Sequence, residues 1–146
     1  MENINDKQFT FFRFEDLRVY HKSMDYALWV KQVSNSFSDM ANMDLANKFN
    51  SAALSIAINI AEGSARNKSQ FIYYLKMAKS VLRECLVYGS LACNMQLITE
   101  EEEMHSRNQL MEMTKMIGAL ISSLQRSAVK VDDESESDYD FDANSY

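Results

Sequence analysis

The chain has 146 residues, of which 47% are hydrophobic, and it contains no proline and only three glycines. Proline and glycine build most tight turns, so their scarcity argues against a β-sandwich or β-barrel and favours long helices with few loops. The net charge of −6 at first argues against nucleic acid as a partner.

The net charge is confined to one end of the chain. Residues 128–146 contain one base and seven acids, whereas residues 1–127 contain fourteen bases and fourteen acids. An acidic, serine-rich segment of this kind buries too little apolar surface to offset chain entropy, so we predict a disordered tail over 128–146. We expect residues 14–127 to form the folded body, with a flexible segment over 1–13 before it.

Several features predict the compartment. The N-terminus has no basic region followed by an apolar run, which predicts no secretory signal. The longest uncharged stretch, residues 85–99, is too short to span a bilayer. Cys85 and Cys93 lie about 12 Å apart along one predicted helix, too far for a disulfide. We therefore expect a cytoplasmic protein with reduced thiols and no membrane contact.

The first two predicted helices cover residues 15–38 and 44–62. The first has two apolar stripes, an arc wider than one neighbouring helix can cover. These stripes are Leu17, Tyr20, Met24 and Leu28, and Val19, Tyr26, Val30, Val33 and Phe37. The second helix is apolar at Leu45, Phe49, Ala52, Ile56 and Ile60, with Leu54, Ile58 and Ala61 on another face. Gly63 follows at once, and we predict that it forms a left-handed C-cap.

The third predicted helix starts at Asn67, which with Gln70 resembles a capping box. Its apolar seam has heptad spacing and small residues in the middle, so a neighbouring helix can approach closely. The seam consists of Phe71, Leu75, Ala78, Leu82, Cys85, Gly89, Ala92 and Gln96.

The fourth predicted helix starts with the capping box of Thr99 and Glu102 and ends near Arg126. Four helices with short connections predict an all-α fold, an antiparallel up-down-up-down four-helix bundle. The additional stripes on the first and third helices predict burial between subunits, with tolerated surface apolarity as the alternative.

Catalytic and metal sites find little support in the sequence. The two histidines are His21 and His105, and only His105 lies in a Glu-x-x-His pattern. A di-iron bundle needs this pattern on two helices and an inward glutamate on each of the other two. We therefore expect no enzyme activity, no metal and no cofactor.

The charge pattern is more informative, because no acid occurs between Gly63 and Arg83. Helical geometry points four of the bases in this segment into an arc of about 80° beside the buried face. These bases are Lys68, Lys76, Lys79 and Arg83. Such a ridge suits a phosphate backbone, and the alternative is a solvated helix flank that serves solubility.

Residues 55–66 read SIAINIAEGSAR, and residues 14–20 read FEDLRVY. With these segments the chain resembles the four-helix-bundle family that includes the intervening-sequence proteins of large-subunit ribosomal RNA genes. The resemblance implies a ring of subunits, usually a homopentamer, without catalytic residues. A more distant branch, the accessory variability determinants of diversity-generating retroelements, binds a reverse transcriptase and its template RNA through a basic pentamer.

The central motif, which contains Asn59, Glu62, Gly63 and Arg66, also has a physical interpretation. A chain reversal at Gly63 would return Arg66 toward Glu62, and a charged cluster there would fix the turn between the second and third helices or a subunit contact. We favour this structural role over ligand binding.

Two functions remain open. The first is a non-enzymatic, homo-oligomeric scaffold that binds RNA, DNA or a nucleic-acid enzyme through the ridge. The second is a protein-interaction ring, with the acidic tail as a docking or regulatory segment. In the first case, we also expect the tail to fold onto the ridge and compete with phosphate.

Overall fold

The computed structural model describes residues 11–37 and 39–131, and their side chains as far as Ser127. A short 3₁₀ helix η1 (Arg13–Asp16) is followed by α1 (Arg18–Ser34), α2 (Met40–Ser64), α3 (Lys68–Asn94) and α4 (Glu100–Val131). No strand occurs in these described ranges, so the predicted all-α class is confirmed. Most of the predicted segment 1–13 lies outside the described residues. Of the predicted tail 128–146, residues 128–131 belong to the last helix, and the rest lies outside the described residues.

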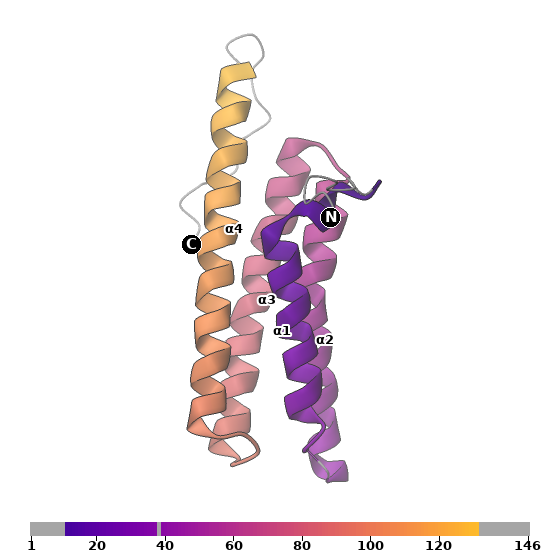
Figure 1. The fold of residues 1–146 in the computed structure, drawn as a ribbon, viewed down its shortest axis with the longest axis vertical. Coiled ribbons are helices and arrows are strands. Elements are labelled where there is room, and N and C mark those ends of the chain that lie inside the picture. Colours follow the sequence, from indigo (N-terminus) through magenta and orange to yellow (C-terminus); the bar gives the residue numbers. More distant parts are fainter. Residues whose placement is uncertain (1–10, 38, 132–146) are drawn as a thin grey trace, which may run out of the picture.

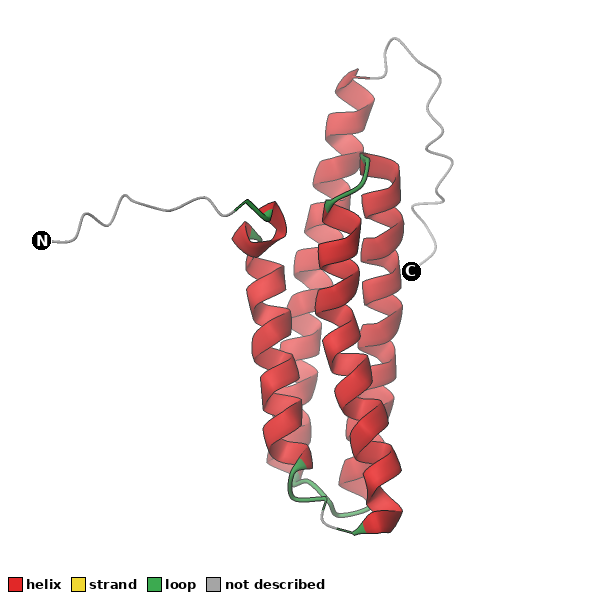
Figure 2. Ribbon diagram, turned by 90° about the vertical axis from the view of Figure 1, so that its right-hand side faces the viewer, coloured by secondary structure: helices red, strands yellow, loops and turns green. Residues whose placement is uncertain are grey.

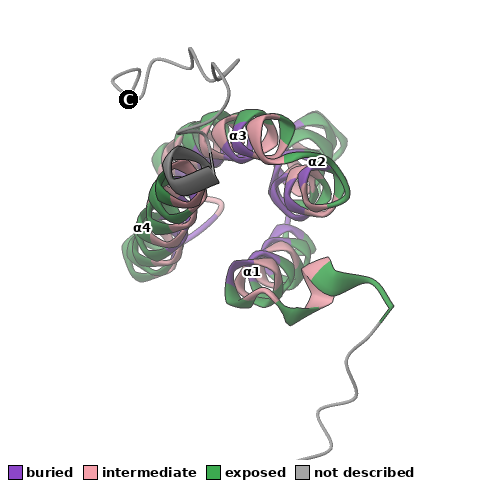
Figure 3. Ribbon diagram, turned by 90° about the horizontal axis from the view of Figure 1, so that it is seen from above, coloured by how far each residue is buried: buried purple, intermediate pink, exposed green. Residues whose placement is uncertain are grey.

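The four helices run alternately up and down the bundle (Figure 1 and Figure 2). Side-chain contacts show the antiparallel packing of α3 and α4. Lys68 at the start of α3 contacts Ser127 near the end of α4, whereas Ser90 near the end of α3 contacts Glu103 near the start of α4. Viewed along its axis, the bundle places α1 beside α2, α2 beside α3 and α3 beside α4, and the buried residues lie on the helix sides that face one another (Figure 3).

The apolar spacing places the core as predicted. One continuous cluster joins Phe49 and Ile56 of α2 to Leu75 and Leu82 of α3, and Met113 of α4 is fully buried with them. In α1 only one of the two predicted stripes is buried throughout, the one that contains Val19, Tyr26, Val30 and Val33. Each buried aliphatic or aromatic side chain of this size contributes about 1.5–3 kcal/mol to folding.

The helix starts follow the predicted caps. The Asn67 side chain accepts a hydrogen bond from the Gln70 backbone N–H at 2.9 Å. Thr99 and Glu102 form a reciprocal capping box, with distances of 3.0 Å to the Glu102 N–H and 2.9 Å from the Thr99 N–H. These caps satisfy backbone donors that a helix start leaves without an intrahelical partner.

Several helix boundaries differ from the predictions. The predicted helix over 15–38 is interrupted at Leu17, which is extended, and α1 ends at Ser34. The hydroxyls of Ser34 and Ser36 bond back to the carbonyls of Lys31 and Val33, which offers the backbone an alternative to further helix. The last helix does not end near Arg126 but continues to Val131, since no proline or glycine breaks it there.

The prediction that Gly63 forms a left-handed cap is wrong. Gly63 is helical, α2 continues to Ser64, and no described glycine has a positive φ. Gly63 instead permits close packing. A Cβ atom at this position would lie 2.6 Å from Cβ of Tyr74 and 2.9 Å from Cδ2 of Phe71. The glycine therefore sets the approach of α2 and α3, because any side chain would force the helices apart.

The turn between α3 and α4 contains Gln96, whose φ of 62° is the only positive φ among the described residues. The predicted seam of the third helix extends to this residue, but α3 ends at Asn94.

Cys85 and Cys93 are both free, as predicted. No helix in the described part of the chain is long and apolar enough to cross a membrane.

Candidate functional site

Of the four predicted bases of the third helix, Lys68 contacts α4, and the helical spacing places the other three within an arc of about 80° of it. We call Lys68, Lys76, Lys79 and Arg83 the basic flank. Lys68 donates a hydrogen bond of 2.7 Å from its Nζ to Oγ of Ser127 in α4. Lys79 lies eleven residues from Lys68 and eleven from Ser90, close to three helical turns each way. Ser90 also contacts α4, so Lys79 lies on the same line of α3 as two residues that contact α4.

Positive charges crowd together on the basic flank. Partial burial lowers the pKa of the Lys79 ammonium, and the neighbouring charges of Arg83 and Lys76 lower it further. Like charges three and four residues apart on a helix repel one another and cost stability. An anion bound there would relieve the repulsion, so this arrangement is typical of a surface that attracts anions.

The adjacent part of α4 adds no acid to this end of the bundle. Residues 113–131 contain no acid, and the last acid before them, Glu112, forms an ion pair with Lys22 of α1. Lys115 and Arg126 of α4 are exposed. The opposite end of the bundle carries the acidic first turn of α4, residues 100–103. The charge of the folded body is therefore polarised along the bundle, although its sum over residues 1–127 is zero.

The predicted motif around Gly63 builds the turn between α2 and α3. The Arg66 guanidinium lies 3.6 Å from the Glu62 carboxylate and 5.0 Å from the centroid of the Tyr74 ring. The predicted contact of Arg66 with Glu62 is present, but it crosses the end of α2, four residues apart, and needs no chain reversal at Gly63. Asn59 lies outside this cluster, because its amide donates to the carbonyl of Ser55 at 2.8 Å.

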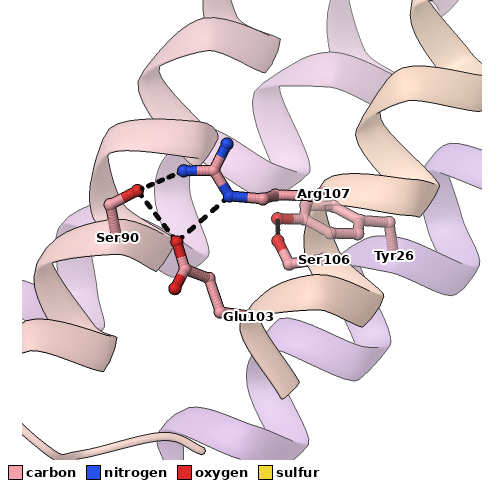
Figure 4. A network of polar contacts seen from close by, with 5 residues as sticks. All are labelled: Tyr26, Ser90, Glu103, Ser106 and Arg107. Atoms are coloured by element: carbon pink, nitrogen blue, oxygen red, sulfur yellow. Dashed lines mark hydrogen bonds and ion pairs between the residues drawn. The ribbon is translucent and has the colours of Figure 1, made fainter. Parts of the chain in front are cut away.

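The structure reveals a polar network that the sequence prediction missed (Figure 4). The Arg107 guanidinium contacts the Glu103 carboxylate at 3.1 Å and donates to Ser90 Oγ at 2.9 Å, and Ser90 donates to Glu103 at 3.1 Å. Hydrogen bonds from Cys93 and Arg107 lower the pKa of the Glu103 carboxyl. The four-residue spacing of Glu103 and Arg107 signals their ion pair, but only the tertiary register brings Ser90 to it.

Further contacts join the first helix to the last. The hydroxyls of Tyr26 and Ser106 are hydrogen-bonded at 2.7 Å (Figure 4), and the Trp29 ring lies 5.1 Å from the ring of His105. His105 thus contacts an aromatic ring of α1. Across the described residues, no group of three or more His, Cys, Asp or Glu side chains has the arrangement that would hold a metal ion.

Large apolar side chains are exposed on the outer faces of all four helices, with Met104 and Met111 on α4. In α1 the bundle leaves only Met24 and Leu28 of the Leu17–Leu28 stripe exposed, and it leaves the outer face of α2 exposed as well. On the first three helices these residues include Met24 and Leu28 of α1, Leu54 and Ile58 of α2, and Tyr73, Met77, Val87 and Leu91 of α3.

The fold and these surfaces define a small all-α bundle with one basic flank and exposed apolar outer faces. The family model of the 23S rRNA-intervening sequence proteins matches residues 15–119, and the chain belongs to this family. The family predicted from residues 14–20 and 55–66 is thereby confirmed. The matched region covers α1 to α3 and most of α4, and it ends before the acidic segment begins. No curated protein matches the chain.

Proposed function

We propose that this protein is a non-enzymatic, homo-oligomeric scaffold that binds RNA or DNA through the basic flank of α3. The observation that carries this function is the crowding of Lys76, Lys79 and Arg83 beside a stretch of α4 without acids. The chain belongs to a family whose name refers to an intervening sequence of 23S rRNA. This name supports a nucleic acid, rather than another polyanion, as the ligand. A nucleic-acid enzyme, such as a reverse transcriptase, would join this assembly when it and the scaffold bind the same RNA strand.

Self-association would extend the basic flank. A single flank of about four bases makes few phosphate contacts, and affinity for nucleic acid grows steeply with the number of contacts. A ring of subunits, such as the homopentamer that the family resemblance implies, would repeat the flank around its axis. The exposed apolar faces of α2 and α3 supply surface for contacts between subunits.

The test is the salt dependence of binding to a structured RNA. For the full chain, log K should fall linearly with log salt concentration. The triple variant Lys76→Glu, Lys79→Glu, Arg83→Glu should bind more weakly, with a slope smaller by about two to three, since each lost phosphate contact removes about 0.9. A matched control reverses three exposed bases elsewhere, with Arg18→Glu, Lys31→Glu and Lys48→Glu, and should retain most of the slope.

A second candidate function is a protein-interaction scaffold, favoured by the exposed apolar faces alone. In that case RNA binding would be absent at low salt, or the two triple variants would lose affinity equally. Either result would remove the basic flank as the nucleic-acid site.

A further inference from the structure

The acidic segment that follows α4 emerges at the basic end of the bundle. The last described residue, Val131, lies four residues past Ser127, which contacts Lys68. At 1.5 Å per residue, the helix end is about 6 Å beyond this contact. Residues 132–142 then contain seven acids and no base.

The lengths permit this segment to reach every base of the flank. From Lys68 to Arg83, α3 rises about 22 Å. The fifteen residues after Val131 span up to about 50 Å when extended. The segment is therefore long enough to turn back at the end of α4 and follow the basic flank as far as Arg83.

The charges are complementary along the same path. The basic flank and its border on α4 carry no acid from Asn67 to Arg83 or from Met113 to Val131. The seven acids between Asp132 and Asp142 carry a charge of −7, whereas residues 1–131, with fifteen bases and fourteen acids, carry +1. At ordinary ionic strength the charges would lie within one Debye length, about 8–10 Å, once the segment lies along the basic flank.

We propose that the acidic segment 132–142 binds the basic flank of the same chain and competes there with nucleic acid. Its carboxylates would occupy the positions that phosphates take, so the segment is an internal substitute for the polyanion. The contact itself depends only on charge and reach, while the competition rests on the proposed function. Because the family match ends at residue 119, this regulation would belong to the part of the chain that follows the matched region.

The contact is tested without nucleic acid. In the full chain, a zero-length carbodiimide reagent joins lysines to carboxylates that touch them, and mass spectrometry maps the products. We expect the acidic segment to be joined to Lys68, Lys76 and Lys79 at low salt, and these products should disappear near 1 M salt. Products spread equally to Lys31 and Lys48, or none on the flank, would overturn the proposal.

A charge reversal that keeps all lysines in place sharpens this experiment. Arg83→Glu should reduce the products at Lys76 and Lys79 several-fold, whereas the control Arg18→Glu should leave them unchanged. A mixture of heavy- and light-isotope protein separates contacts within one chain from contacts between chains. Products mainly between chains would contradict binding within one chain.

The competition has its own readout. A full-length variant with the seven acids changed to Asn or Gln should bind structured RNA on the order of tenfold more tightly at low salt, with the difference vanishing at high salt. The control Glu100→Gln, Glu101→Gln removes acids from the opposite end and should leave affinity unchanged. Equal affinity of the neutral-tail variant and the native chain would refute the competition. If neither protein binds RNA, the proposed function fails, and the cross-linking result alone decides whether the segment contacts the flank.

Discussion

The hydroxyl of Tyr26 in α1 lies 2.7 Å from the hydroxyl of Ser106 in α4, and the two residues are only 1% and 2% exposed. This hydrogen bond joins the first and last helices, which no loop connects directly. Gly89 of α3 lies against the same point, because a Cβ atom there would be 3.6 Å from Ser106 Oγ. The pair therefore places three helices in register at one buried polar site.

Removal of either hydroxyl should leave the other buried without a partner. We expect Tyr26→Phe and Ser106→Ala each to lower the free energy of unfolding by about 1–2 kcal/mol. The double variant should lose clearly less than the sum, since it removes both polar groups at once. Urea unfolding of the four proteins measures this cycle, and strictly additive losses would show that the hydroxyls do not interact.

Two buried groups should make the protein sensitive to alkaline pH. Burial raises the pKa of the Tyr26 hydroxyl far above its usual value and raises that of the Cys85 thiol to about 12. In the unfolded chain these groups titrate near pH 10 and 8.5. The unfolded chain thus loses its protons first, so stability is complete below about pH 8.5 and falls as pH rises toward the folded values.

The Cys85→Ala variant isolates one of these groups. The native chain should lose stability between pH 9 and pH 11 more steeply than this variant, by up to about 1.4 kcal/mol per pH unit. Urea unfolding at several pH values measures the two slopes. Parallel slopes would mean that the thiol does not contribute.

The sequence predicted the features that depend on neighbouring residues. Helix spacing identified the buried faces, and the caps at Asn67 and Thr99 are local motifs with a known geometry. The shared direction of Lys68, Lys79 and Arg83 likewise follows from spacing alone. Whether this direction faces α4 or α2 depends on the register between helices, which local patterns do not encode.

Gly63 shows why the remaining features escaped prediction. A glycine at an apparent helix end suits a left-handed cap, but the same residue also suits a position where a neighbouring helix leaves no room for Cβ. The choice was decided by Tyr74 and Phe71 of α3, which lie in a different helix. The network at Ser90 and Arg107 was missed for the same reason, since its members meet only across the packed hairpin.

A pair of glycine variants tests the packing role. Gly63→Ala should destabilise the protein by about 1–3 kcal/mol, because the new methyl group meets Cβ of Tyr74 at 2.6 Å. Gly118→Ala is the matched control in α4, where a Cβ atom meets nothing within 4 Å. This control should stabilise the protein by up to about 1 kcal/mol through helix propensity. Thermal or urea unfolding compares them, and stabilisation by both would contradict close packing at Gly63.

The outer face of α2 tests self-association. Leu54 and Ile58 are 45% and 51% exposed, so a charge at either position adds little strain within one subunit. We expect Ile58→Asp to lower the subunit count in sedimentation or native mass spectrometry, because a carboxylate in an apolar contact must be desolvated. Its helical content should be unchanged, since substitutions at exposed positions usually shift stability by less than about 0.5 kcal/mol.

The control for this variant is Asn108→Asp, which adds the same charge at an exposed position of α4. It should keep the subunit count of the native chain. If both variants dissociate, net charge rather than the apolar face governs assembly. If Ile58→Asp keeps the native count, the outer face of α2 lies outside the contact, and the exposed side chains of α1 and α3 become the surfaces to test. The same samples link assembly to RNA binding, because a dissociated variant presents fewer basic flanks per particle and should show a smaller salt slope.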